Sequence, residues 1–286
     1  MIYFCADDYG ISEGADSCIK NCVEYGVLNK ISVLPNSRAT DFKQKFSAKE
    51  VMVSLHINLV EGKTLSNKED IDLLVTEDGN FKHSFIGLLY LSLSSKKKEL
   101  EKQIYKEIQS QIRYWKKEMG EDIAFSIDSH QHTHMIPLIF KTLMKVVRDE
   151  GIKVSYLRIP NEPLSPYLLT PSLYFEYSPV GLIKQWLLKI FAAINRSEFK
   201  KSKIQSAYFM GVLFSGKLNE VKIKKILPKY LKIAKKKNKD IEIGFHPGII
   251  KDEEDLLGGI RHDFKKFYAS LWRKIEHDTL INLNIK

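Results

Sequence analysis

Short runs of β-branched and aromatic residues alternate along the chain with longer segments in which apolar residues recur every three or four positions. The short runs predict eight strands, at residues 2–5, 31–34, 51–55, 123–127, 154–159, 207–213, 241–245 and 280–283. Strands that alternate with helices are typical of a parallel α/β sheet or barrel. We therefore expect an α/β protein built on such a sheet.

The clearest helical pattern covers residues 95–119. Its apolar positions follow the spacing of one helix face, and they are Leu100, Ile104, Ile108, Ile112 and Trp115. Gly120 comes directly after this pattern, where glycine commonly ends a helix. This spacing predicts a long helix with one buried face.

Two stretches interrupt the alternation, and we interpret both as insertions into a single domain that covers residues 1–286. Residues 62–94 contain Asp78-Gly79, a pair typical of a hairpin turn. Residues 160–206 begin with four prolines and continue into an apolar segment with lysines, 182–191. That segment fits a basic helix on a membrane surface and equally a core helix whose lysines reach to solvent.

The composition is that of an ordinary globular protein, with 286 residues, 44% hydrophobic and 28% charged. It excludes a disordered, collagen-like or coiled-coil chain, and the length suits one α/β barrel. The three cysteines (Cys5, Cys18 and Cys22) form no Cys-x-x-Cys pair, which favours a reducing, cytoplasmic compartment. We expect neither a signal peptide nor a membrane-spanning segment, because basic leader residues and long uncharged apolar stretches are both missing.

The net charge of +10 is unevenly distributed. Residues 179–239 carry 16 Lys and Arg against two acids, a balance of +14, so the rest of the chain carries −4. A basic surface of this kind suits an anionic lipid, an acidic polymer or a nucleic acid, and it is also what a solvated face looks like.

Polar side chains follow five of the predicted strands at the point where each strand ends. They are Asp7 and Asp8, His56, the histidine cluster of residues 130–134, Arg158, and His246. The carboxyl ends of parallel strands meet at one rim, which bears the active site in α/β barrels. We expect these side chains to converge there.

Histidine and carboxylate together suit a divalent metal held by three protein ligands, with one position open for water or substrate. Side chains of adjacent residues after a strand point in opposite directions, so one of the two aspartates can bind the metal while the other holds a water; capping of the next helix is the alternative. His130, His132 and His134 alternate along the chain, and spacing alone does not choose among them. A metal hydrolase is the leading interpretation, and zinc, magnesium, cobalt and manganese all suit the ligands.

Four motifs, in order, extend this interpretation: ADDYGIS at residues 6–12, SLHINL at 54–59, DSHQHTH at 128–134 and EIGFHPG at 242–248. Together they resemble the YdjC family of carbohydrate deacetylases, which includes chitooligosaccharide deacetylases and hopanoid-associated proteins. The resemblance covers nearly the whole chain and matches least at residues 160–206. It implies a distorted (β/α) barrel related to the NodB-type polysaccharide deacetylases.

Carried over by motif, the resemblance implies that Asp8, His56 and His130 bind one divalent ion, Mg²⁺ or Zn²⁺. It makes Asp7 the general base, and His246 an acid or a donor to the transition state. Gln131 is a departure, because relatives often have histidine there, but its side chain is expected to point away from the ligands.

The implied reaction is hydrolysis of the N-acetyl group of an amino sugar, with release of acetate. His132 or His134 is an alternative proton donor, or orients a metal ligand through a hydrogen bond. Arg158 has two open roles: it binds a hydroxyl, phosphate or carboxylate of the substrate, or it forms a salt bridge with a strand-end acid.

Two other functions are kept as alternatives. One is a phosphoesterase or amidohydrolase on a related barrel, which usually needs two metals and more ligands; the other is a non-enzymatic module that binds lipid or nucleic acid through residues 179–239. The expected partner is an N-acetylated amino sugar or glycan, and nucleic acid is not expected. We also expect contact with an anionic membrane, or with a lipid-linked substrate at the inner face of the membrane. The protein is further expected to form a homodimer.

Overall fold

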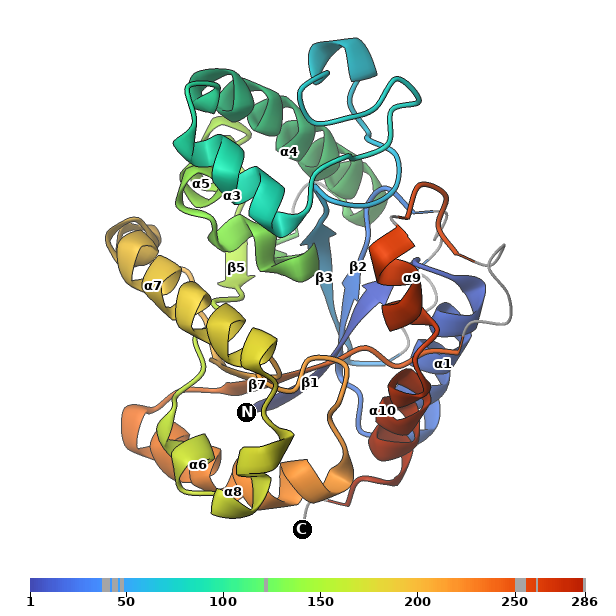
Figure 1. The fold of residues 1–286 in the computed structure, drawn as a ribbon, viewed down its shortest axis with the longest axis vertical. Coiled ribbons are helices and arrows are strands. Elements are labelled where there is room, and N and C mark those ends of the chain that lie inside the picture. The colour runs from blue at the N-terminus through green and yellow to red at the C-terminus, as the bar shows by residue number, and fades with distance from the viewer. Residues whose placement is uncertain are drawn as a thin grey trace.

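A curled sheet of seven strands forms the centre of this computed structural model (Figure 1). The strands are β1 (Ile2–Tyr9), β2 (Lys30–Val33), β3 (Met52–Ile57), β4 (Phe125–Ser129), β5 (Val154–Leu157), β6 (Tyr208–Met210) and β7 (Ile241–Phe245). Their order is β5-β4-β3-β2-β1-β7-β6, and every neighbouring pair is parallel. The structure describes residues 1–37, 42, 46, 49–120, 123–249, 256–260 and 262–284.

Helices surround this sheet. The described α-helices are α1 (Glu13–Tyr25), α3 (Phe85–Leu93), α4 (Lys97–Met119), α5 (Pro137–Asp149), α6 (Ser165–Leu168), α7 (Pro179–Ser202), α8 (Glu220–Lys237), α9 (His262–Tyr268) and α10 (Leu271–Asn282). Three short 3₁₀ segments are η1 (Lys68–Asp70), η2 (His130–Met135) and η3 (Pro171–Glu176). The parallel sheet with its helices confirms the predicted α/β architecture, consistent with a (β/α) barrel.

Most residues of the seven strands are buried. All five residues of β4 and of β7 are buried, as is the carboxyl end of β1. Short runs of β-branched and aromatic residues located the strands in the sequence, although buried polar residues such as Ser126 and Asp128 lie within β4. Parallel pairing then brings their carboxyl ends to one edge.

The long helix is confirmed. α4 spans Lys97–Met119, and its five predicted apolar positions are all buried. Gly120 ends it with φ 102°, in the region that favours glycine, and its N–H donates to the Lys116 carbonyl.

The predicted strand at residues 280–283 is wrong, because residues 271–282 form α10. Ser270 begins this helix by accepting a hydrogen bond from the Trp272 N–H. The buried side chains Arg273, Glu276 and Leu280 recur at helical spacing, so the buried face contains charged residues. A short run of β-branched and apolar residues at the end of such a helix looks like a strand when hydrophobicity is considered alone.

The insertion at residues 62–94 contains the predicted turn. Val75 and Phe81 form an antiparallel bridge, and Gly79 lies between them with φ 78°. The Gly79 N–H donates to the Thr76 carbonyl across 2.9 Å, which closes the turn. The rest of the insertion holds η1 and α3.

The second insertion crosses the gap between the two edge strands, β5 and β6. It contains α6, η3 and α7, and its last residues return to the sheet at Gln205. Gln205 bridges Tyr156 of β5 in parallel and accepts a hydrogen bond from the Leu157 N–H. The inner face of α7 is buried, as a core helix requires. Within the described residues, the helices are all too short or too polar to cross a bilayer.

Candidate active site

The two adjacent aspartates lie within β1, which continues past its predicted end at residue 5. Both are buried, and Asp8 has φ 67° in the left-handed region, which is uncommon for a residue other than glycine. The pairing of β1 with β2 is irregular between Ala6 and Tyr9. Helix α1 is capped by Ser12, whose Oγ accepts the Ala15 N–H. The aspartates are therefore left for the site.

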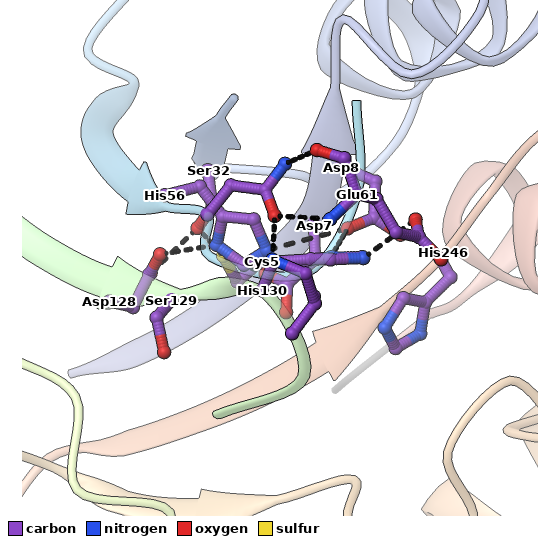
Figure 2. A network of polar contacts seen from close by, with 12 residues as sticks. Cys5, Asp7, Asp8, Ser32, His56, Glu61, Asp128, Ser129, His130 and His246 are labelled. Atoms are coloured by element: carbon purple, nitrogen blue, oxygen red, sulfur yellow. Dashed lines mark hydrogen bonds and ion pairs between the residues drawn. The ribbon is translucent and has the colours of Figure 1, made fainter. Parts of the chain in front are cut away.

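Asp8, His56 and His130 come together at this edge of the sheet (Figure 2). Asp8 Oδ1 lies 2.8 Å from His130 Nδ1 and 3.4 Å from His56 Nε2. The other ring nitrogen of each histidine binds a carboxylate: His56 Nδ1 lies 2.6 Å from Asp128 and His130 Nε2 lies 3.0 Å from Glu61. Carboxylates behind histidines in this way fix the tautomer and orientation of metal-binding rings.

The donor atoms fit a divalent cation. Among the described residues, Asp8 Oδ2 and His56 Nε2 are buried without a hydrogen-bond partner, a costly state for polar atoms unless another group binds them. Burial alone would raise the pKa of Asp8, but the charge and hydrogen bond of His130 hold it well below its usual value. Burial lowers the pKa of His130, and Asp8 and Glu61 outweigh this and raise it to about 10. The carboxylates of Asp8 and Glu61 beside the two imidazoles are a donor set that suits a cation.

Asp7 faces a different partner, Arg158. Arg158 Nη1 and Nη2 lie 2.7 and 2.8 Å from the two carboxylate oxygens of Asp7. Burial acts to raise the pKa of Asp7, and the adjacent guanidinium outweighs it, so that the pKa is lowered. Asp7 is therefore ionised at neutral pH.

Arg158 also holds Glu242, with Nε and Nη2 at 2.9 and 2.7 Å from Glu242 Oε1. Its side chain is fully buried. Of its two open roles, the structure shows the salt bridge with a strand-end acid. Lys30 lies 2.8 Å from the same Glu242 oxygen and 3.6 Å from Asp128, so each of these buried carboxylates has a cationic partner.

His246 follows β7 and lies on the other side of the aspartates from Asp128 (Figure 2). Burial lowers the pKa of His246 to about 4, so its ring is neutral at pH 7. Its backbone N–H donates to Glu276 across 2.5 Å, and its Nδ1 has no hydrogen-bond partner among the residues that the structure describes. Burial raises the pKa of Glu276 to about 7, although the hydrogen bonds from the backbone N–H groups of His246 and Leu218 act to lower it.

The other two histidines of the cluster have separate environments. The strand ends at Ser129, and Gln131 and His132 adopt left-handed φ of 55° and 61°, so the three histidines do not share one strand face. His134 is used structurally: Nδ1 lies 2.5 Å from Ser129 Oγ and Nε2 lies 2.8 Å from the Arg158 carbonyl oxygen. His132 lines the cavity with Nδ1 unpartnered.

A cavity of about 260 Å³ opens over these residues. Its floor includes Asp7, Asp8, His56, His130 and His246. Its walls come from the second insertion, the loop after β6, and α9, with Ser178, Gly181, Lys184, Phe214, Phe264 and Tyr268 among the lining residues. The predicted strand-end residues thus converge on one site, except that Arg158 and His134 lie behind it.

Sequence reasoning missed several residues of the site. Glu61 follows the SLHINL motif closely, and an acid so near a candidate ligand is a usable signal. Tyr268 donates to Glu61 across 2.6 Å. In the part of the chain that the structure describes, the three side-chain nitrogens of Arg273 have no hydrogen-bond partner, and Nη1 lies 3.9 Å from Asp8. Both lie after β7, in a part of the chain for which the sequence analysis predicted only a strand.

Comparisons with known proteins identify the family of this chain. The model of the YdjC-like protein family matches residues 1–286. A carbohydrate deacetylase of Danio rerio is 29% identical over 161 residues, which are 55% of this chain and 49% of that relative, so the match spans about half its length. A crystal structure from Enterococcus faecalis V583 is described as that of a candidate cellobiose-phosphate cleavage protein. It matches this chain with a TM-score of 0.67 at 18% sequence identity, and the match covers 98% of this chain and 90% of that chain. The two proteins therefore share a fold. This chain belongs to the YdjC-like protein family.

Proposed function

We propose that this protein is a metal-dependent hydrolase that removes an N-acetyl group from an amino sugar and releases acetate. The observation that carries the proposal is the pair of adjacent aspartates at the cavity floor. Asp8 faces His56 and His130, while Asp7 is held ionised by Arg158. One carboxylate is thus available as a ligand and the other as a base.

Asp8, His56 and His130 are the residues that would hold the ion. The chemistry that a divalent ion supplies when bound is polarisation of a carbonyl oxygen and a lower pKa for a water molecule. Glu61 and Asp128 keep the two imidazoles oriented, because each binds the ring nitrogen that faces away from Asp8.

Asp7 accepts the proton of the attacking water at a carboxylate oxygen. Because its pKa is low, the protonated form is a strong acid, and it returns the proton to the leaving nitrogen as the C–N bond breaks. His246 is neutral at pH 7, so of its two implied roles we propose the hydrogen-bond donor to the transition state. His132 lines the same cavity and is placed to contact the substrate.

A single ion is favoured over the two metals of a phosphoesterase-type site. Two further groups of potential ligands exist in the described residues, Cys5–Asp128–Glu242 and Asp7–His56–Asp128. Arg158 and Lys30 already supply positive charge to the carboxylates of both groups. A second cation there would meet two buried cations.

The substrate class and the location are proposed on separate grounds. The family membership and the name of the Danio rerio relative support an N-acetylated amino sugar or glycan. The three cysteines are buried and unpaired, which supports a reducing, cytoplasmic location.

The Asp7→Asn variant tests the base. We expect it to keep its bound metal and to lose about 10²–10⁴ in the rate of acetate release, the usual contribution of a general base. Acetate release is measured on a panel of free, oligomeric and carrier-linked N-acetylated amino sugars, with metal content measured on the same samples. Asp8→Asn is the matched control. We expect this variant to lose its bound metal, because Asp8 is a proposed ligand.

An Asp7→Asn enzyme with unchanged metal and unchanged rate contradicts the role of Asp7. Acetate release by the wild type that persists after chelation contradicts the metal dependence. Two metals per chain at full activity favour the phosphoesterase-type alternative.

A further inference from the structure

Helix α7 is apolar on two opposite faces. Its inner face includes Leu188 and Phe191, which are buried in the core. Its outer face exposes Leu182, Ile183, Trp186 and Ile194, with 68% of Ile183 and of Trp186 accessible. A helix that is hydrophobic all round is normally covered on both sides, and α7 is covered on one.

A second helix, α3, also exposes apolar side chains. Its Phe85 stacks on Phe191, on the inner side of α7, at a ring separation of 6.4 Å. α3 exposes Ile86, Tyr90 and Leu93, the last with 80% of its surface accessible. α3 and α7 thus each expose a group of apolar side chains, and exposed apolar groups of this kind mark an interaction site.

The charge on α7 indicates what covers its outer face. Lys189, Arg196, Lys200 and Lys201 are exposed, and within the described residues none of them forms an ion pair. The helix has one acid, Glu198, and it is bound to Arg148 at 2.6 Å. Basic side chains beside exposed aromatic and aliphatic ones fit an anionic lipid surface, at about 1 kcal/mol per basic residue.

A second copy of the chain is a poorer fit to this face. Two-fold symmetry places the same patch on both subunits, so two α7 helices would bring their lysines together. Like charges that meet in this way oppose association, and the one acid of α7 is already paired.

The outer face of α7 adjoins the mouth of the active-site cavity. Gly181 and Lys184, in its first two turns, line the cavity, while Ile183 between them points to solvent. Val180 belongs to both surfaces, because it lines the cavity and is 76% exposed. A flat surface that contacts the outer face of α7 would therefore lie next to the active-site cavity.

We propose that α7 docks through its outer face on an anionic lipid bilayer, so that the cavity opens at the membrane surface. Docking depends only on α7 and its lysines. Its consequence, that the enzyme draws a lipid-borne amino sugar from the bilayer, rests on the proposed function.

Sedimentation with vesicles tests the docking. The wild type is expected to bind vesicles of equal phosphatidylglycerol and phosphatidylcholine and to bind pure phosphatidylcholine at least 10-fold more weakly, with salt weakening the binding. The double variant Ile183→Ser/Trp186→Ser is expected to lose at least 10-fold in binding to the anionic vesicles. Leu271→Ser, at a 79% exposed position of α10, is the matched control and binds as the wild type does.

These side chains are exposed and outside the cavity lining, so both variants are expected to keep the wild-type melting temperature and the wild-type rate on a water-soluble substrate. The proposal is overturned if the wild type does not bind anionic vesicles, or if the double variant binds them as well as the control does. A dimer that dissociates in the double variant, without vesicle binding, identifies a second copy as the occupant. Vesicle binding is measured without substrate, so its failure is separate from a failure of the deacetylase assay.

Discussion

At the scale of single residues, the site depends on how one backbone position separates two neighbouring carboxylates. Asp8 adopts φ 67°, and its side chain faces two histidines, whereas that of Asp7 meets Arg158. A left-handed conformation at a non-glycine residue costs of order 1–3 kcal/mol, which the surrounding structure offsets. The two carboxylates can then take different roles in the same reaction, one as a ligand and the other as a base.

Arg158→Lys tests whether the guanidinium fork positions Asp7. The cation stays, so Glu242 and Asp128 keep a charge partner, but the two parallel hydrogen bonds to Asp7 are lost. We expect kcat to fall about 10–100-fold with KM and metal content unchanged, because a displaced base costs rate rather than binding. Steady-state kinetics with metal analysis measures this, and a wild-type kcat contradicts the positioning role.

Glu61→Gln tests the carboxylate behind His130. The amide keeps the size of the side chain but removes the charge that faces His130 Nε2. Metal affinity is expected to fall about 10–100-fold, the usual effect of losing such a partner, as measured by metal titration. Glu69→Gln, on exposed η1, is the control and leaves the affinity unchanged.

At the scale of elements, periodicity in the sequence located most of the fold because each buried element has one simple apolar pattern. The stripe of α4 and the runs of β1 to β7 are of this kind. α10 differs, since its buried face carries Arg273 and Glu276, which hydrophobicity alone cannot identify as inward. The same reason applies to the site. Asp8, His56 and His130 could be predicted because they lie at the ends of predicted strands, whereas Arg273 lies on α10 and comes near Asp8 only through the packing of that helix.

The buried stripe of α4 gives a prediction for stability. Ile108 is fully buried, and Ile108→Ala is expected to lower the free energy of unfolding by about 2–5 kcal/mol through lost burial and a residual cavity. Lys98→Ala, at an exposed position of the same helix, is expected to change it by less than about 0.5 kcal/mol. Urea denaturation of both variants measures the difference, and equal midpoints would contradict the assigned face.

At the scale of the whole molecule, buried charge links folding to pH. Glu276 is buried, and its pKa is raised from 4.5 to about 7. The folded protein therefore keeps a proton between these values that the unfolded chain releases. The stabilisation from this proton is fully present below pH 4.5 and is lost as pH rises through 7, by about 3 kcal/mol in all.

Glu276→Gln isolates this effect, because glutamine does not titrate. The stability of the wild type relative to the variant is expected to fall by about 3 kcal/mol from pH 4.5 to pH 8, as measured by urea denaturation at several pH values. Other titrating groups are common to both proteins and cancel in the comparison. A difference that is constant with pH would show that Glu276 is already ionised at the acid end.

The gap between β5 and β6 has an evolutionary consequence. The sheet is bridged there by Gln205, and the segment 160–206 that crosses the gap builds a wall of the cavity without contributing a strand. Changes in the length or composition of this segment leave the hydrogen-bonded register of the seven strands intact. Changes in residues 160–206 can therefore alter substrate preference within the family while the metal ligands and the base stay in place.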